Sequence, residues 1–323
     1  MTERTTPTSA TASPWPRRLA VSTLVAAVPL VFFGGTVTTL HAGLAIDGWW
    51  ILEPGRGDHF LWLYPVDKWF RDVGTFVEHT HRLFGSLVGL LAIATVVATW
   101  ATDRRRLSRI LSVAALLAVI AQGVIGGLRV LEQSEDLAFL HGAIGQAVFA
   151  TLGASAVAAS VAFGAARATG PDFRTSRLRR LSLVAAASVY LQIVAGAWLR
   201  HGGRVPALAV HGLLAALVVV STCLLAAEMR RGDASLEGLR KWILGLLSAQ
   251  IVLGVAALVV VWGMQGSDSR VATGLGSSFF PTLHVLFGGG LLFACVASAM
   301  WIHRLSPSPA ARERFAAAVE GAR

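Results

Sequence analysis

Four histidines recur at matching places in a sequence that is otherwise strongly apolar: His81, His141, His211 and His284. Each lies within about two helical turns of one end of an apolar run that is long enough to cross a bilayer. Ionisable side chains are costly inside a membrane, so four of them at one depth favour a binding function over chance. Imidazole nitrogens ligate metals, and the pattern therefore predicts metal-ligating sites inside a helical bundle.

A carboxylate and an arginine flank the first of these histidines, in the stretch EHTHRLFGS that begins at Glu78. Glu78 lies three residues before His81, so the two side chains share one helical face about one turn apart. A carboxylate in that place could accept a proton or orient water beside a bound substrate. Arg82 offers a different interpretation, an i,i+4 ion pair with Glu78 at the membrane boundary. Arg82 could also bind a carboxylate of the bound molecule.

The apolar runs predict an all-α, polytopic membrane protein. Of the 323 residues, 54% are hydrophobic and only 14% are charged. The runs are rich in Ala, Leu, Val and Gly and lack the alternation of a membrane β-barrel, so we expect helices. We predict eight transmembrane helices, over residues 19–40, 77–100, 111–130, 139–163, 181–199, 208–227, 243–262 and 281–302.

Basic residues gather in alternate connections between these runs, for example at 104–106 and 230–231, whereas the other connections carry more of the acidic residues. By the positive-inside rule both termini lie in the cytoplasm, and the histidines lie toward the outer face of the cell's inner (plasma) membrane. The net charge of +10 comes from these topology-setting arginines. Because no basic motif with interleaved aromatic residues accompanies them, we expect a lipid bilayer and no nucleic acid as partner.

The second half of the chain repeats the first. Gln122 aligns with Gln250, each followed four residues later by glycine, and His81 and His141 align with His211 and His284. The sequence thus predicts two tandem four-helix-bundle repeats with the same orientation. The predicted order is a disordered cytoplasmic tail (1–14), an N-terminal repeat (15–165), a basic cytoplasmic linker (166–180), a C-terminal repeat (181–304) and a second cytoplasmic tail (305–323). The repeated Gln-x-x-x-Gly pattern favours close helix packing and interhelical hydrogen bonds.

Two imidazoles between apolar helices are most simply the ligands of haem iron, because the flat and largely apolar macrocycle suits an interior lined by small side chains. Zinc or copper without a porphyrin is the alternative, but such sites usually add a third ligand, and only Glu78 offers one. The second repeat has Leu208 in the place of Glu78. His211 and His284 are therefore suited to holding a cofactor permanently, whereas the first pair shares its cavity with an acid.

Other candidate residues have simpler interpretations. His79 points to the opposite side of the helix from His81, and His41, His59 and His201 lie in or beside outer connections, where His201 has Arg200 and Arg204 nearby as possible carboxylate-binding groups. We expect Cys223 and Cys295 to be small buried hydrophobic residues. The connection 42–76 contains four tryptophans, at 49, 50, 62 and 69. They could fold a cap over the first-half cavity or rest on lipid headgroups.

The combination resembles the haem A synthase family, through the histidine in each even-numbered span and the E-x-x-H-R motif at Glu78, His81 and Arg82. The resemblance implies that His211 and His284 hold haem b, and that His81 and His141 surround haem O as the substrate, with Glu78 needed for activity. The implied reaction oxidises a ring methyl group of haem O stepwise to a formyl group, which gives haem A for terminal oxidases. A haem O synthase and an electron donor or acceptor are the implied partners. Residues 41–76 lack the cysteine pair that some bacterial members carry.

Two other classes of protein remain as alternatives. A dihaem membrane cytochrome b would use both histidine pairs for permanent haems and act as an electron carrier. Such a carrier would have little use for Glu78, which has no counterpart in the second repeat. A transporter built on tandem repeats would be expected to show discontinuous helices and charge near the membrane midplane, whereas the ionisable groups here cluster toward one face.

Overall fold

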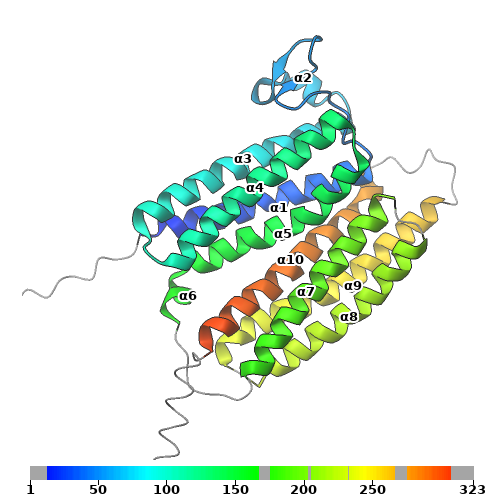
Figure 1. Cartoon of the computed structure of the whole chain (residues 1–323). Coiled ribbons are helices and arrows are strands. Elements are labelled where there is room, and N and C mark those ends of the chain that lie inside the picture. The colour runs from blue at the N-terminus through cyan, green and yellow to red at the C-terminus, as the bar shows by residue number, and fades with distance from the viewer. Residues whose placement is uncertain (1–12, 167–174, 203–204, 232, 266–274, 307–323) are drawn as a thin grey trace, which may run out of the picture.

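The fold is a bundle of eight long helices (Figure 1). The computed structural model describes residues 13–166, 175–202, 205–231, 233–265 and 275–306. The long helices are α1 (Trp15–Thr39), α3 (Val73–Thr102), α4 (Arg106–Glu132), α5 (Glu135–Ala159), α7 (Thr175–Arg200), α8 (Val205–Met229), α9 (Glu237–Gln265) and α10 (Leu275–Leu305). All eight are long and apolar enough to cross a membrane, which confirms the predicted fold class. Residues 1–12 and 307–323, most of the two predicted tails, lie outside the described residues.

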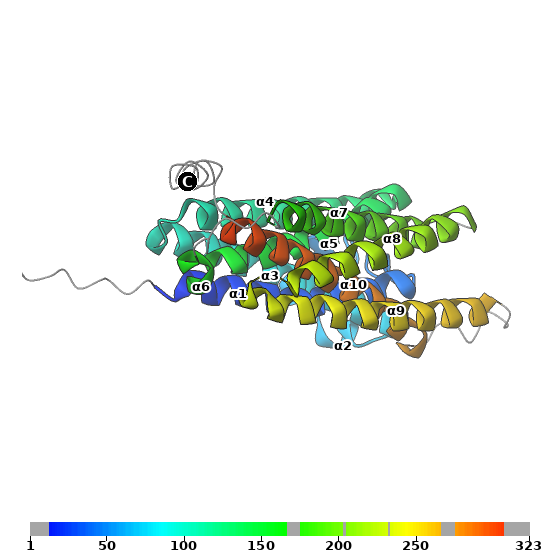
Figure 2. The ribbon, with the colours of Figure 1, turned by 90° about the horizontal axis from the view of Figure 1, so that it is seen from below.

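Consecutive long helices pack together in pairs: α1 with α3, α4 with α5, α7 with α8, and α9 with α10. Figure 1 shows α1, α3, α4 and α5 on one side of the bundle and the last four helices on the other, and Figure 2 shows the same helices from below. Helix α10 lies against α7 and also against α5 and α1, so it joins the two sets. The division into two tandem four-helix repeats stays a prediction.

The core of the second set is centred on α10, where Leu291 and Cys295 are buried against Leu225 of α8 and Ile243 of α9. Cys295 thus has the buried position expected from the sequence. The same expectation was wrong for Cys223, which is exposed on the surface of α8. The reason is that in a membrane bundle the outward-facing side of a helix is as apolar as its inward-facing side, so hydrophobicity alone does not indicate which side is buried.

Two boundaries differ from those predicted. Helix α5 ends at Ala159, and Ser160 begins the short helix α6 (Val161–Ala165), where its hydroxyl oxygen accepts a hydrogen bond from the backbone N–H of Phe163 at 3.4 Å. The fourth predicted span, 139–163, is therefore interrupted near its end. Helix α7 begins at Thr175, so residues 175–180 of the predicted linker are helical, while 167–174 lie outside the described residues.

The connection between α1 and α3, residues 40–72, forms a small folded unit that we call the cap. It contains the antiparallel strands β1 (Ile51–Leu52) and β2 (His59–Phe60), the 3₁₀ turn η1 (Leu61–Leu63) and the helix α2 (Val66–Trp69); a second 3₁₀ turn, η2 (Ala234–Leu236), precedes α9. Ile46, Leu52, Leu61 and Tyr64 form the buried core of the cap, with Trp69 packed against it. In Figure 1 the cap projects beyond the end of the bundle.

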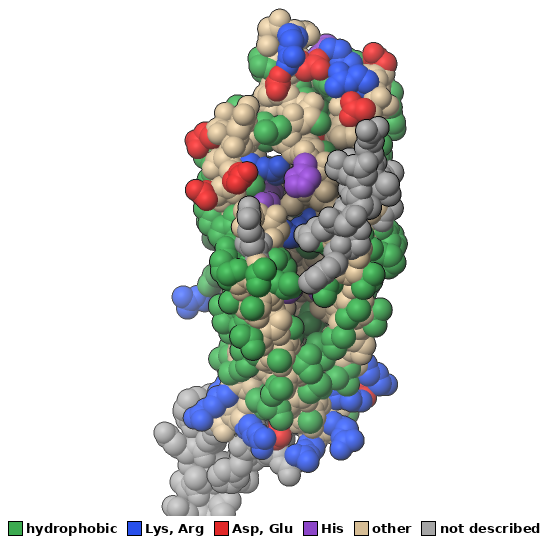
Figure 3. All heavy atoms as spheres, turned by 90° about the vertical axis from the view of Figure 1, so that its right-hand side faces the viewer, with side chains coloured by type: hydrophobic (Ala, Val, Ile, Leu, Met, Phe, Trp, Pro, Cys, Tyr) green, Lys and Arg blue, Asp and Glu red, His purple; other side chains and the backbone are tan. Residues whose placement is uncertain are grey.

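Charged side chains lie at the two ends of the molecule (Figure 3). Lysine and arginine gather at the end opposite the cap, which we call the basic end, and the cap carries both acidic and basic residues. Hydrophobic side chains cover the length between the two ends, as a bilayer requires. Under the positive-inside rule the basic end is the cytoplasmic one, and this orientation stays a prediction.

Candidate functional site

The structure brings the four predicted histidines together as two pairs. The ring centroids of His81 on α3 and His141 on α5 are 6.3 Å apart, with an interplanar angle of 81°. Those of His211 on α8 and His284 on α10 are 6.2 Å apart, at 74°. Two imidazole nitrogens at about 2.0–2.1 Å from one metal ion would place their ring centroids about 6.3 Å apart. Both pairs therefore have the separation expected of two ligands on opposite sides of a single ion.

Each histidine ring lies against a glycine of the neighbouring helix. A Cβ atom on these glycines would stand only 2.8–3.0 Å from the ring carbon Cε1 of the histidine. The pairs are Gly34 with His81, Gly126 with His141, Gly196 with His211, and Gly254 with His284. Any larger residue would push the ring away, so the glycines set the positions of all four histidines.

The same ring edge faces a backbone carbonyl. Nδ1 of His81 lies 3.0 Å from the carbonyl oxygen of Leu30, four residues before Gly34, and donates to it when Nδ1 carries the proton. At the other three histidines the carbonyl of a glutamine, again four residues before the glycine, interacts with the ring in a looser geometry than a regular hydrogen bond. Metal-ligating histidines commonly donate one ring N–H to such a carbonyl, which fixes the tautomer and leaves the other nitrogen as the ligand.

The glutamines of the Gln-x-x-x-Gly pattern connect neighbouring helices, as the sequence predicted. The side-chain amide of Gln122 donates to the backbone carbonyl of His141 at 2.6 Å. The amide nitrogen of Gln192 lies 3.2 Å from Nε2 of His211, the nitrogen that a metal ion would use. These contacts hold the histidine-bearing helix against its neighbour and do not add a metal ligand.

The histidine pairs fit haem better than a bare metal ion. Among the residues that the structure describes, no group of three or more His, Cys, Asp or Glu side chains could hold a metal ion. Each pair therefore supplies two ligands to a metal ion. The remaining ligands of that ion must come from the cofactor or substrate that contains it. The four nitrogens of a porphyrin meet that need.

Glu78 and Arg82 form the ion pair that the sequence offered as one interpretation. Glu78 is only 3% exposed, and both of its carboxylate oxygens accept hydrogen bonds. Oε1 accepts from Arg82 at 2.7 Å, and Oε2 accepts from the backbone N–H of Ile46 at 3.0 Å. Arg82 also donates to the carbonyls of Ile46 at 3.0 Å and Gly48 at 2.8 Å. This Glu78–Arg82 clasp fastens the cap to the helix that carries His81.

The cap also rests on α3 through His79, which is 2% exposed and packs between Tyr64 and Trp69. Trp69 donates from its indole nitrogen to the hydroxyl of Thr80 at 3.1 Å. His79 therefore lies under the cap and away from the His81 pair. Of the two interpretations of the tryptophan-rich connection, the structure shows the folded cap.

Sequence reasoning missed Arg129 of α4. Its guanidinium contacts Gly43 of the cap, and its charge acts on both His81 and His141. Its side chain has no hydrogen bond or ion pair with the part of the chain that the structure describes. A single arginine inside the third predicted span was the signal that could have found it, because a charge at that depth is costly unless it serves a site.

The residues around His201 join the two halves of the bundle. Arg200 donates to the carbonyl of Gly35 at 3.0 Å and to the hydroxyl of Thr39 at 2.6 Å, so it connects α7 to α1. Burial, with the nearby charges of Arg200 and Arg129, lowers the pKa of His201 to about 4 and keeps the ring neutral near pH 7. Arg204 lies outside the described residues.

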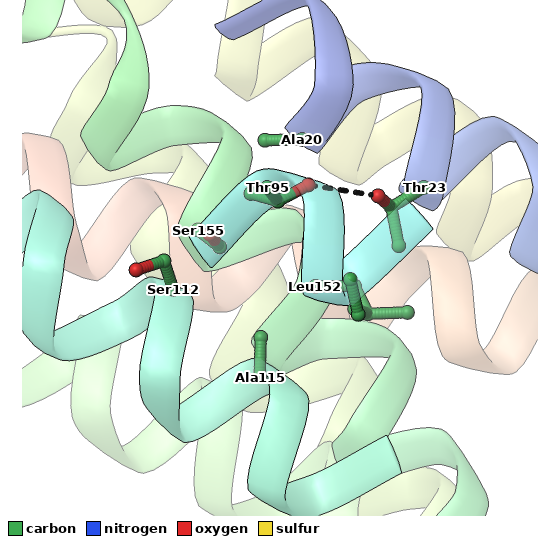
Figure 4. Close-up of a pocket in the computed structure, with 8 residues that line it drawn as sticks. Ala20, Thr23, Thr95, Ser112, Ala115, Leu152 and Ser155 are labelled. Carbon is green, nitrogen blue, oxygen red and sulfur yellow. Dashed lines mark hydrogen bonds between the residues drawn. The ribbon is translucent and has the colours of Figure 1, made fainter. Parts of the chain in front are cut away.

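A small cavity of about 10 Å³ lies among the first four long helices, away from the histidines (Figure 4). Thr23 of α1 and Thr95 of α3 meet beside it, with their hydroxyl oxygens 3.2 Å apart. Ser112 of α4 and Ser155 of α5 also line it. Its volume suits about one water molecule, so it serves helix packing and not substrate binding.

Comparison with known proteins agrees with this geometry. The COX15-CtaA family model, described as cytochrome oxidase assembly protein, matches residues 69–210, a stretch that includes Glu78, His81 and His141 and ends one residue before His211. The chain is 30% identical over 125 residues to a haem A synthase of an Exiguobacterium species, 38% of each chain. It is 28% identical over 179 residues to the haem A synthase of Exiguobacterium sibiricum, 54% of this chain and 55% of that one.

The chain thus matches about half or less of the length of these curated relatives. No solved structure was found to match it. The matched stretch contains the E-x-x-H-R motif and the first histidine pair, which are part of the pattern that carried the resemblance; His211 and His284 lie beyond it. Over this stretch the chain is therefore similar to haem A synthases.

Proposed function

We propose that this protein is a haem A synthase, which oxidises a ring methyl group of haem O stepwise to a formyl group and so provides haem A for terminal oxidases. The observation that carries the proposal is the pair of matched histidine sites, of which only the first, among the residues described, has a clasp and a cap. Two alike sites for a porphyrin with unlike surroundings favour one resident haem and one substrate haem.

His211 and His284 are the proposed ligands of a permanent haem b. Gly196 and Gly254 set the positions of their rings, and Gln192 holds α7 against α8 beside His211. Haem b bound there would supply one-electron transfer. This half has Leu208 at the place of Glu78, so its described residues contain no counterpart of the clasp.

His81 and His141 are the proposed ligands of the substrate haem O. We propose Arg129 as the residue that binds a carboxylate of this haem, because its charge lies beside both histidines without a hydrogen-bonding partner among the described residues. Arg82, the candidate from the sequence, already donates to three oxygens of the protein. Glu78 accepts a hydrogen bond at each oxygen, so we propose that it supports activity as a positioning residue that keeps the cap closed and water out.

The proposal extends to location and partners. Each of the four histidines lies near the start of its helix, at the cap end of the bundle, which would face outward from the plasma membrane if the basic end is cytoplasmic. A haem O synthase would supply the substrate. An electron acceptor or donor outside this chain must also take part, because oxidation of a methyl to a formyl group removes electrons.

The experiment that tests the function is extraction and chromatographic identification of the haems in the purified protein, expressed with and without a haem O synthase. Haem b together with haem O, hydroxylated haem O or haem A, the last three only with the synthase, would support the proposal. Two equivalents of haem b under both conditions would replace it with the dihaem electron carrier.

Variants test the assignment of the two sites. His211→Ala or His284→Ala should remove the tightly held haem b, whereas His81→Ala should leave haem b bound and stop turnover. Full haem b occupancy in both second-half variants would contradict the assignment of that site.

A further inference from the structure

A groove of about 580 Å³ lies at the basic end, far along the helices from the histidine pairs. Its walls come from the last turn of α3, the short connection that follows and the first three turns of α4. Arg104, Arg106 and Arg109 line its outer part, together with Trp100. We propose that this groove binds an anionic phospholipid of the membrane, with its phosphate among the arginines and an acyl chain along α4.

Along one face of α4 the groove changes from charged to apolar, in the same order as a phospholipid changes from its phosphate to its acyl chains. Arg106 and Arg109 are followed on the same face by Ile110, Val113 and Leu117, at spacings of three and four residues. This stripe extends for about 16 Å along the helix axis. Ile110 is 50% exposed and Leu117 is 60% exposed, so the apolar part is open to a lipid chain.

Two of the arginines have no partner among the described residues. Neither Arg104 nor Arg106 makes a hydrogen bond or an ion pair with a residue that the structure describes, and both are exposed. Their neighbour Arg105 has the structural role, because it pairs with Asp103 at 2.7 Å and donates to the carbonyls of Ala159 and Ser160. Asp103 is therefore already neutralised, and within the part of the chain that the structure describes the groove has an uncompensated positive charge that suits a phosphate.

The third arginine is fixed in place at the level where headgroups begin. The guanidinium carbon of Arg109 lies 5.0 Å from the ring centroid of Trp100. Arg109 also donates to the carbonyls of Asp103 at 2.7 Å and Trp100 at 3.1 Å. Tryptophan is enriched where the hydrocarbon meets the headgroups, so the arginines stand at the depth of lipid phosphates. Three arginines in one groove favour a headgroup with two phosphates, cardiolipin, over one with a single phosphate.

The test is native mass spectrometry of the delipidated full-length protein in detergent, titrated with cardiolipin, phosphatidylglycerol or phosphatidylcholine. We expect one retained cardiolipin, weaker retention of phosphatidylglycerol and no preferred retention of phosphatidylcholine. The Arg104→Gln/Arg106→Gln variant should bind cardiolipin about 30-fold more weakly, since each basic residue contributes about fivefold. Because both side chains are exposed and unpaired, this variant should fold normally, and unchanged haem content would confirm that it does.

The matched control is Arg180→Gln/Arg230→Gln, which removes the same charge from exposed positions at the basic end outside the groove. It should retain cardiolipin like the unaltered protein. Equal weakening in both double variants would overturn the proposal, because it would show a general effect of charge. Retention of phosphatidylcholine equal to that of cardiolipin, or displacement of cardiolipin by inorganic phosphate at the same concentration, would overturn it as well.

Discussion

Removing the negative charge of Glu78 while keeping its shape should release the cap. In Glu78→Gln one oxygen is replaced by an NH₂ group, which must face either Arg82 or the backbone N–H of Ile46, and both of these are donors. One of the two hydrogen bonds is therefore lost whichever way the amide turns. The lost charge-assisted bond and the unsatisfied donor together cost the closed cap about 2–4 kcal/mol. The opening equilibrium should rise by a factor of about 30 to 1,000.

Hydrogen exchange followed by mass spectrometry measures this opening directly. In Glu78→Gln, exchange should rise in the peptide that contains Ile46 and Gly48, whose backbone groups the clasp holds, and should stay unchanged in α8. Glu132→Gln is the matched control, an exposed carboxylate at the same end of the bundle. The reasoning fails if exchange at Ile46 is the same in Glu78→Gln and in the control, or if it rises equally throughout the protein.

Three further changes have defined outcomes. Arg82→Lys keeps the charge opposite Glu78 but loses the planar fork that reaches two carbonyls, so the same peptide should exchange at a rate between those of the unaltered protein and Glu78→Gln. Gly126→Ala places a methyl group 2.8 Å from Cε1 of His141 and should lower haem binding in the first half. Gly123→Ala is the control, because its new methyl group would have no atom within 4 Å, and it should leave haem binding unchanged. Equal haem absorbance in the two variants would contradict this packing role. The Lys68 ammonium holds the pKa of Glu53 below its ordinary value of 4.5. The contribution of this carboxylate to cap stability is therefore complete above pH 4.5 and is lost as the pH falls through the lowered pKa. Tryptophan fluorescence between about pH 6 and pH 3 should report the loosening of the cap, and Glu53→Gln should abolish this pH-dependent change.

The sequence was sufficient for the eight helices and for the four histidines, because both depend on patterns that are local to a span. Apolar length identifies a transmembrane helix, and the repeat aligns His81 with His211 without knowledge of any contact. The break at Ser160 was not predicted, because the surrounding residues are as apolar as a continuous span. The exposed position of Cys223 was missed for a related reason, since a helix surface that faces lipid is apolar as well.

Contacts between distant segments were beyond the sequence. The ion pair between Glu78 and Arg82 was one of the interpretations that the sequence offered, but their bonds to Ile46 and Gly48 depend on the path of the cap. That path includes a positive φ of 80° at Gly48, a conformation that favours glycine. The glycines of the Gln-x-x-x-Gly pattern were recognised as packing residues, but that each provides the space for a histidine ring appears only when two helices are placed together.

The chemistry of the clasp bears on how the first site could exchange its ligand. An apolar latch of the same size would resist opening, because opening would expose hydrophobic surface to water. A buried ion pair is different: its mutual attraction roughly offsets the cost of removing both charges from water, and on opening both charges are hydrated again. The Glu78–Arg82 clasp can therefore specify where the cap closes without making closure irreversible. The second pair has Leu208 in place of Glu78 and no such ion pair in the described ranges around it, and this difference is what a retained haem and an exchanged haem would require.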